Sequence, residues 1–263
     1  MNSVQPIHTW ELVMAAVFLL FAGSLSWMLT LGLGRSLTVG AVRTYVQLLA
    51  LGIVLRWVFA NQSPALVVLL LMVMMLIAAH TLLGRVRSRP KGLFLPSLLS
   101  IAVSGLTVTL AVTELIIRVH PWYNPQYVLP IAGMVLGNSM TGISLALERL
   151  FGDLGRRSDE VRMLLALGAS PWEASLPSIR AALTAGLIPT INAMNAVGIV
   201  SIPGMMTGQI IAGANPGMAA RYQIVVMLML SAATAIGSMM AVALAYHKSF
   251  DREARFVLPE SKP

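Results

Sequence analysis

The segment Leu167-Gly168-Ala169-Ser170-Pro171-Trp172-Glu173 lies in the centre of residues 148–189, the longest polar interruption in an otherwise apolar chain. Its second half predicts the start of a helix. Ser170 is suited to cap that helix, Pro171 to occupy its first turn, and Glu173 to complete a capping box. A helix that begins after so polar a stretch is expected to run back toward the apolar part of the chain.

A shorter helix is predicted just before this point. Ser158 is a candidate cap, and two carboxylates follow it in the first turn, where they suit the positive end of the helix dipole. Val161, Leu164 and Leu165 recur at helical spacing, and Gly168 is placed to end the helix. A short amphipathic helix, a one-glycine corner and a returning helix together indicate a docking element. The alternative is an ordinary cytoplasmic loop with a surface helix.

The composition predicts a multi-pass membrane protein. The chain has 263 residues, of which 57% are hydrophobic and 11% charged, and its mean hydropathy is +0.80. Cysteine is absent, so thiol catalysis and thiolate metal sites are excluded. We expect one transmembrane permease domain, residues 1–263, with a cytoplasmic loop at 148–179 and a solvated cytoplasmic tail at 247–263.

The fold class we predict is all-α: a membrane helix bundle of about seven transmembrane helices. Each predicted span is near the roughly 20 residues that a helix needs to cross hydrocarbon. The predicted spans cover residues 12–33, 43–59, 65–84, 95–117, 127–147, 180–202 and 222–246.

The distribution of positive charge predicts the orientation. With the N-terminus outside, all of the eighteen Lys and Arg residues except Arg56, Arg118 and Arg221 fall at cytoplasmic edges. The same orientation places residues 148–179 in the cytosol, between spans five and six. The net charge of +8 is explained by this bias, and no basic stripe with interleaved aromatic residues indicates nucleic-acid binding.

Amides and hydroxyls at membrane depth are candidates for a substrate path between the second, fifth and sixth spans. Neutral oxygen ligands suit a hard or borderline cation, because they replace its hydration shell without fixing charge. The alternative is that these groups only form hydrogen bonds between helices. The candidates are Gln47, Asn138, Ser139, Thr141, Asn192 and Asn195.

Glu114 is a candidate at the outer end of that path, because a carboxylate within a membrane span usually faces the bundle interior or a water-filled cavity. The alternative is an ion pair with Arg118, four residues later. Pro189, beside Asn192 and Asn195, predicts a broken helix in the sixth span. Residues 198–209 are too apolar for an exposed loop and too rich in Gly and Pro for a plain helix. No spacing of His, Asp or Glu amounts to a metal site, so any metal ligand is unknown.

Residues 166–173 resemble the coupling loop of ABC-transporter permeases, in which a short helix around a fixed glycine inserts into a cleft of the ATPase. Importer permeases carry Glu-Ala-Ala six residues before that glycine, and this chain has Arg162-Met163-Leu164, which is a departure from the importer families. The resemblance implies that Gly168 couples the chain to an ATPase. The implied apolar anchors are Leu164, Leu165, Leu167 and Trp172.

A longer resemblance covers about residues 10–258. Gly137-Asn138-Ser139-Met140-Thr141-Gly142, the loop at 167–170, residues 197–210 and Arg43-Thr44-Tyr45-Val46-Gln47-Leu48 together resemble the FetB-type family of ABC permeases. That family is implicated in bacterial iron export, and its plant relatives in aluminium tolerance. The resemblance therefore implies a multi-pass protein of the bacterial inner membrane that exports iron or a related metal cation. Nothing in spacing or composition indicates iron.

The chain has no Walker A loop, since Gly32-Leu33-Gly34-Arg35 lacks the lysine and the length, so it cannot hydrolyse ATP alone. We expect no cofactor in this chain, and ATP with Mg in a cytoplasmic ABC ATPase subunit. A homodimer of the permease within the lipid bilayer is also expected. Two alternatives remain: a secondary transporter driven by an ion or proton gradient, with Glu114 as carrier, and a membrane scaffold without transport.

Overall fold

The computed structural model describes residues 8–257 except 31, 33, 88, 89, 252 and 254. The described residues are almost entirely helical, and their only β pairing is two isolated bridges, Val197 with Ser201 and Phe250 with Phe256. Internal contacts divide them into two units. One comprises residues up to 62 together with 211–213, and the other comprises 63–210 and the chain from 214 onward. The all-α prediction is confirmed, while the single-domain interpretation stays a prediction.

The first unit is a helical pair. α1 (Thr9–Met28) packs against α2 (Gly34–Asn61), and the hydroxyl of Tyr45 donates a hydrogen bond to the carbonyl of Leu12. α2 begins about nine residues earlier than the predicted second span. Arg35, just after the first predicted span of residues 12–33, lies in the first turn of α2.

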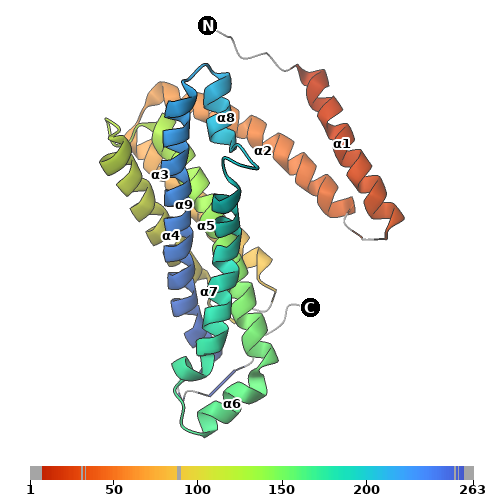
Figure 1. Ribbon diagram of the computed structural model, residues 1–263, viewed down its shortest axis with the longest axis vertical. Helices are drawn as coiled ribbons and strands as arrows, with labels where there is room; N and C mark the ends of the chain where they lie inside the picture. The colour runs from red at the N-terminus through yellow and green to blue at the C-terminus, as the bar shows by residue number, and fades with distance from the viewer. Residues whose placement is uncertain are drawn as a thin grey trace. The chain divides into compact units, whose positions relative to one another are not determined.

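The second unit contains the remaining elements (Figure 1). α4 passes without a break into a π-helical turn, η1, and α9 passes into a short 3₁₀ turn, η2. The elements are α3 (Pro64–Arg85), α4 (Phe94–Leu110), η1 (Ala111–Ile117), α5 (Pro125–Arg156), α6 (Ser158–Ala166), α7 (Pro171–Ala196), α8 (Gly204–Ile211), α9 (Pro216–Ala245) and η2 (Tyr246–Ser249).

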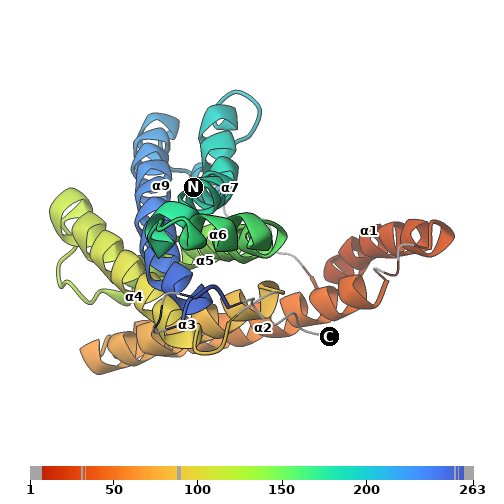
Figure 2. The ribbon, with the colours of Figure 1, turned by 90° about the horizontal axis from the view of Figure 1, so that it is seen from below.

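α5 is the central helix of this unit. It contacts α3, α4, α7 and α9, and the end-on view of Figure 2 shows those helices arranged around it. Its own sequence explains the position, because buried apolar residues recur along its length, from Val128 and Val135 to Ile143 and Leu150. One core cluster joins three helices. It includes Val108 of α4, Val135 of α5 and Ala233 of α9.

Small residues bring α5, α7 and α9 into close contact. A Cβ atom on Gly142 of α5 would lie 3.0 Å from the carbonyl oxygen of Gly186 on α7, and it would clash with the Cγ2 of Thr234 on α9. Ser238 of α9 lies beside both glycines. Close packing of small residues is typical of helices that associate within membranes.

Within the described residues, five helices are long and apolar enough to cross a membrane: Gly34–Asn61, Pro64–Arg85, Phe94–Ile117, Pro125–Arg156 and Pro216–Ser249. They correspond to predicted spans two, three, four, five and seven. The chain is therefore an all-α, multi-pass membrane protein. The prediction of seven spans additionally requires α1 and α7.

The helices around the polar stretch differ from the predicted spans in two respects. α5 continues beyond the predicted fifth span, from residue 147 to Arg156, because Leu150, Phe151 and Leu154 maintain its buried face. The sixth span was expected to break at Pro189, but α7 runs through both Pro177 and Pro189 to Ala196. Neighbouring helices allow a helix to tolerate proline in this way.

The C-terminal segment is more ordered than predicted. After η2 the chain turns, and the backbone N–H groups of Asp251 and Val257 donate to the carbonyls of Arg255 and Ser249, at 3.0 and 2.8 Å. Phe256 is 92% buried, and its ring meets that of Phe250 edge to face. The described part of the tail, up to residue 257, is therefore folded rather than a solvated end.

Candidate functional site

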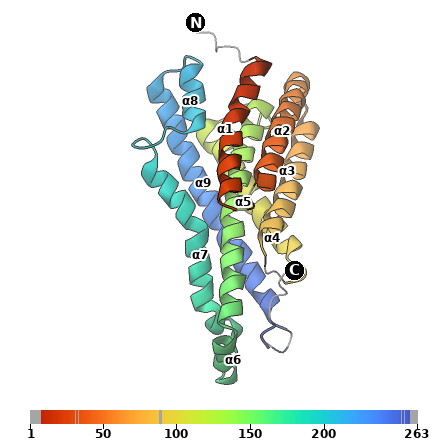
Figure 3. The same ribbon diagram turned by 90° about the vertical axis from the view of Figure 1, so that its right-hand side faces the viewer.

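The candidate site is the corner between α6 and α7, at the end of α5 (Figures 1 and 3). Gly168 has φ of +92°, a conformation that favours glycine. Its backbone N–H donates to the carbonyl of Leu165, and the N–H of Ala169 donates to that of Leu164, both at 3.0 Å. These two bonds form a Schellman motif, so the predicted glycine stop is confirmed.

The start of α7 is confirmed in detail. The N–H of Glu173 donates to the Ser170 hydroxyl at 3.3 Å, and the N–H of Ser170 donates to the Glu173 carboxylate at 2.8 Å. The Ser170 hydroxyl also donates to that carboxylate. The two bonds that the Glu173 carboxylate accepts lower its pKa below the ordinary value. The bond from the Ser170 backbone has the larger effect and the bond from the Ser170 hydroxyl the smaller.

The predicted cap of α6 is wrong. Ser158 is the first residue of α6, its side chain forms no cap, and the capping position belongs to Arg157. The reason is the length of α5, which leaves Arg157 as the single residue between the two helices. Its N–H donates to the carbonyl of Asp153, and its carbonyl accepts from the N–H of Val161, both at 2.9 Å.

α6 has one buried face and one exposed apolar pair. Val161 is fully buried, while Leu164 and Leu165 are half-buried toward the rest of the unit. Met163 and Leu167, four residues apart and so on the same side of the helix, are 56% and 78% exposed. Trp172 at the start of α7 is partly exposed and meets the ring of Tyr246 edge to face, with ring centroids 5.4 Å apart. Leu167 and Met163 are therefore the most open apolar side chains at the corner.

A polar network joins α5, α6 and α7. The Arg157 guanidinium donates to both carboxylate oxygens of Glu160 on α6, at 2.8 and 2.6 Å, and to the Ser178 hydroxyl on α7, at 3.0 Å. Ser178 in turn donates to the carboxylate of Asp153 on α5, at 2.9 Å. The side chains of Arg157 and Asp153 are 21% and 13% exposed. The network fixes the N-terminal end of α6 relative to α5 and α7.

The ionisation of this network is set mainly by one contact. The hydrogen bond from Arg157 lowers the pKa of the Glu160 carboxyl, and the same bond raises the pKa of the Arg157 guanidinium. Both groups are therefore charged near neutral pH, which strengthens the hydrogen bonds between them.

The folded tail lies beside the corner. A groove of about 420 Å³ separates Arg162, Leu165 and Ala169 from the tail residues Arg255 and Phe256. The exposed side of the corner is thus flanked by charged residues of both segments, of which Arg255 is paired with Glu253.

The candidate path residues of α5 have different surroundings. Asn138 and Thr141 are exposed, and their side chains donate to carbonyls one turn earlier in the same helix, those of Met134 and Gly137. Arg85 of α3 also donates to the Thr141 hydroxyl, at 3.4 Å. Ser139 is fully buried, and its hydroxyl has no hydrogen-bond partner among the described residues.

The other candidates lie on two other helices. Asn192 and Asn195 are exposed on the last turns of α7, and Gln47 is exposed on α2 in the first unit. The exposed Asn138 and Thr141 share one face of α5, as their spacing of three residues requires. The interpretation of all six residues as a path stays a prediction.

Glu114 lies in the π-helical turn that ends α4. Its Oε1 is buried and has no hydrogen-bond partner within the described part of the chain. Arg118, which was considered as its partner, adopts a left-handed conformation (φ 58°) and caps the turn with its backbone. The regular helix that an i,i+4 pair requires has therefore ended before Arg118. π-helical turns are frequent at functional sites.

Two features of the site were missed from the sequence, the exposed Met163 and the Arg157 network. Met163 is the exposed partner of Leu167, and the signal was their spacing of four residues. Asp153 and Ser178 belong to the Arg157 network but are 25 residues apart in sequence, so no local pattern joins them.

Among the described residues no group of three or more His, Asp or Glu side chains is arranged to hold a metal ion.

The helices and their hydropathy define a multi-pass α-helical membrane protein with a structured polar corner. The chain belongs to the Uncharacterised protein family (UPF0014), which matches residues 9–250. The match covers both units and the whole corner.

Relatives extend from bacteria to plants. The chain is 38% identical over 216 residues to the UPF0014 membrane protein slr1647 of Synechocystis, covering 82% of this chain and 83% of the relative. It is 33% identical over 238 residues to the Arabidopsis thaliana Protein ALUMINUM SENSITIVE 3, covering 90% and 86%. It is 33% identical over 262 residues to the probable iron export permease protein FetB of Escherichia coli, covering 100% and 99%. No solved structure matches the chain significantly.

Proposed function

We propose that this chain is the permease subunit of an ABC transporter that exports iron or a related metal cation, driven by a separate ATPase subunit. The observation that carries the proposal is the corner at Gly168. It combines a short helix with an exposed apolar pair, a fixed turn and a rigidly capped returning helix, which is what insertion into a cleft of a soluble partner requires.

The Arg157 network supports a coupling role. A docking helix must transmit its movement to the spans, and Arg157 links α6 to both α5 and α7. Its contacts with α5 and α7 are mostly shielded from water, while its partner on α6, Glu160, is 49% exposed. Such an arrangement moves three elements together. We infer that Leu164, Leu165, Leu167, Gly168 and Trp172, together with Met163, form the contact with the ATPase.

The metal is proposed from the relatives. One is named as a probable iron export permease, and another for sensitivity to aluminium. Amide and hydroxyl groups along the spans suit a cation that must bind and leave, and the candidate path residues are those named from the sequence. ATP and Mg would be bound by the partner.

The proposed arrangement is a homodimer in a bacterial inner membrane, with seven spans and the N-terminus outside. α1 and α7 then supply the two crossings beyond the five apolar helices. The bias of Lys and Arg supports this orientation, because it places the α6 corner and the tail in the cytosol.

A second candidate is favoured by Glu114. A buried carboxylate oxygen without a partner is suited to carry a proton, so a proton-coupled secondary transporter is the alternative. The decisive experiment reconstitutes the purified chain in proteoliposomes with and without its ATPase subunit and follows radioactive iron. ATP-dependent flux that requires the ATPase supports the permease. Flux driven by a proton gradient without ATP would overturn it.

A further inference from the structure

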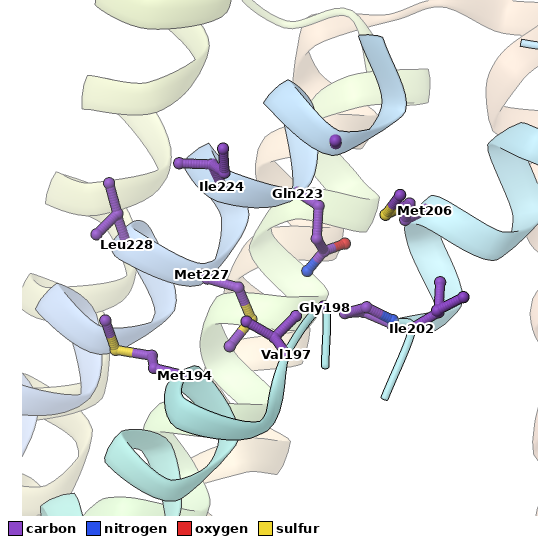
Figure 4. Close-up of a pocket in the computed structure, with 11 residues that line it drawn as sticks. Met194, Val197, Gly198, Ile202, Met206, Gln223, Ile224, Met227 and Leu228 are labelled. Atoms are coloured by element: carbon purple, nitrogen blue, oxygen red, sulfur yellow. The ribbon is translucent and has the colours of Figure 1, made fainter. Parts of the chain in front are cut away.

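A cavity of about 430 Å³ lies between the end of α7, the loop that follows it, α8 and α9 (Figure 4). Its volume falls in the range of about 300–1,000 Å³ that is typical of small-molecule sites. Three methionines line it, Met194, Met206 and Met227, one from each helix. Methionine side chains adapt readily to different apolar shapes.

One polar side chain enters this apolar space. Figure 4 shows the amide of Gln223 extending from α9 toward the segment that carries Gly198 and Met206. Gln223 is 94% buried, and its Oε1 has no hydrogen-bond partner among the described residues. Buried carbonyl oxygens are nearly always paired, so this oxygen lacks a donor that a bound molecule would supply.

The lining also determines the charge of that molecule. None of the residues around the cavity is ionisable, and burial of an unpaired charge there would be strongly unfavourable. A metal ion is less well matched, because the site offers no carboxylate or imidazole and mixes one hard oxygen with soft thioethers. The ligand is therefore neutral, mainly apolar, and carries a hydrogen-bond donor.

The surroundings indicate where such a molecule comes from. In the loop beside Gly198, Ile199 and Val200 are 88% and 84% exposed. Such apolar exposure in the loop that contributes Gly198 to the cavity suits contact with lipid in a multi-pass protein. We propose that the cavity binds a neutral membrane amphiphile, a long hydrocarbon chain with a hydroxyl group, and that the hydroxyl donates to Gln223 Oε1. This inference does not depend on which solute the protein transports.

The test uses the full-length chain in lipid bilayers with a photoreactive hexadecanol that carries a diazirine on its chain. Adducts are mapped by mass spectrometry of peptides. We expect adducts at Met194, Met227 or Leu228, which unlabelled hexadecanol suppresses and hexadecane, lacking the hydroxyl, suppresses far less. Equal suppression by both compounds would overturn the proposal, because it would show a surface that only contacts lipid chains.

Two variants, each with a matched control, distinguish loss of binding from loss of folding. Gln223→Leu should reduce labelling roughly three- to tenfold, the range that one net hydrogen bond produces, whereas Gln62→Leu, an exposed amide, should not. Ala220→Phe should fill the cavity and abolish labelling, whereas Ala232→Phe, exposed on the same helix, should not. Full labelling of Gln223→Leu would overturn the proposal.

Discussion

The carbonyl oxygen of Gly142 on α5 lies 2.8 Å from the position that a Cβ atom on Gly186 of α7 would occupy. The two helices therefore approach as closely as their backbones allow, and α9 closes the contact with Ser238. Since an added methyl group at either glycine meets backbone or helix-bound side chains, the contact cannot relax cheaply.

We predict that Gly186→Ala destabilises the folded protein by about 1–3 kcal/mol, the usual cost of overpacking. The control is Gly137→Ala on α5, where an added Cβ meets nothing within 4 Å. Monodisperse yield in detergent and thermal unfolding provide the measurement. Equal stability of the two variants would contradict the close contact.

Arg157 should contribute more to stability and coupling than the exposed Arg156 beside it. Arg157→Gln removes contacts with Glu160 and Ser178, and we expect a loss of about 1–3 kcal/mol, the range for hydrogen bonds to charged groups. Arg156→Gln is the control. The Arg156 side chain is 65% exposed, and within the described part of the chain it pairs with Asp153, at 3.2 Å. Hydrogen exchange of α6 amides and transport per ATP hydrolysed measure the effect. Similar values for both variants would remove Arg157 from the coupling mechanism.

Gly168→Ala should strain the corner, since φ of +92° is unfavourable for a residue with a Cβ, at a cost of about 1 kcal/mol. We expect weaker binding of the ATPase, measured by co-purification, with the membrane helices intact. Gly155→Ala within α5 is the matched change, and it should leave binding unaltered. Undiminished ATPase binding and transport in Gly168→Ala would exclude the corner as the docking element.

Measuring both metal efflux and folded yield distinguishes residues that line a path from residues that only pack. Asn138→Ala and Asn195→Ala should lower metal efflux at normal folded yield, because both side chains are exposed and Asn138 bonds only within its own helix. Ser139→Ala should preserve yield, since its buried hydroxyl has no partner to lose among the described residues. Normal efflux in both asparagine variants would rule them out, whereas lost yield would assign them to packing.

The orientation is testable without background, because the chain contains no cysteine. Single cysteines at Ser3, outside the described residues, and at Asp159, exposed in α6, report the two sides. A membrane-impermeant reagent on intact cells should label Ser3→Cys and spare Asp159→Cys. The reverse pattern would mean that the bundle is inverted.

The corner could be predicted because its determinants are local. A glycine stop, a capping serine and a glutamate three residues later act through bonds within a few residues, and each forms as predicted. The existence of apolar spans followed from hydropathy alone. Predicting these features does not require knowing the tertiary contacts.

The extent of α5 and α7 could not be predicted in the same way. The predicted fifth span ends at residue 147, before the charge of Glu148. Leu150 and Leu154 continue the helical period beyond it, so burial rather than hydropathy determines where the helix ends. Pro189 is tolerated because α7 is supported by its neighbours. The Arg157 network depends on tertiary contacts that no spacing in the sequence reveals.

α5 has 32 residues and is therefore roughly 48 Å long, at about 1.5 Å per residue. The hydrocarbon core of a membrane is only about 30 Å thick. The helix that carries Asn138 in the bundle is thus the same uninterrupted rod that presents Asp153 to the α6 corner. Under the proposed function, a small tilt imposed at the corner would therefore be carried into the bilayer by one continuous helix.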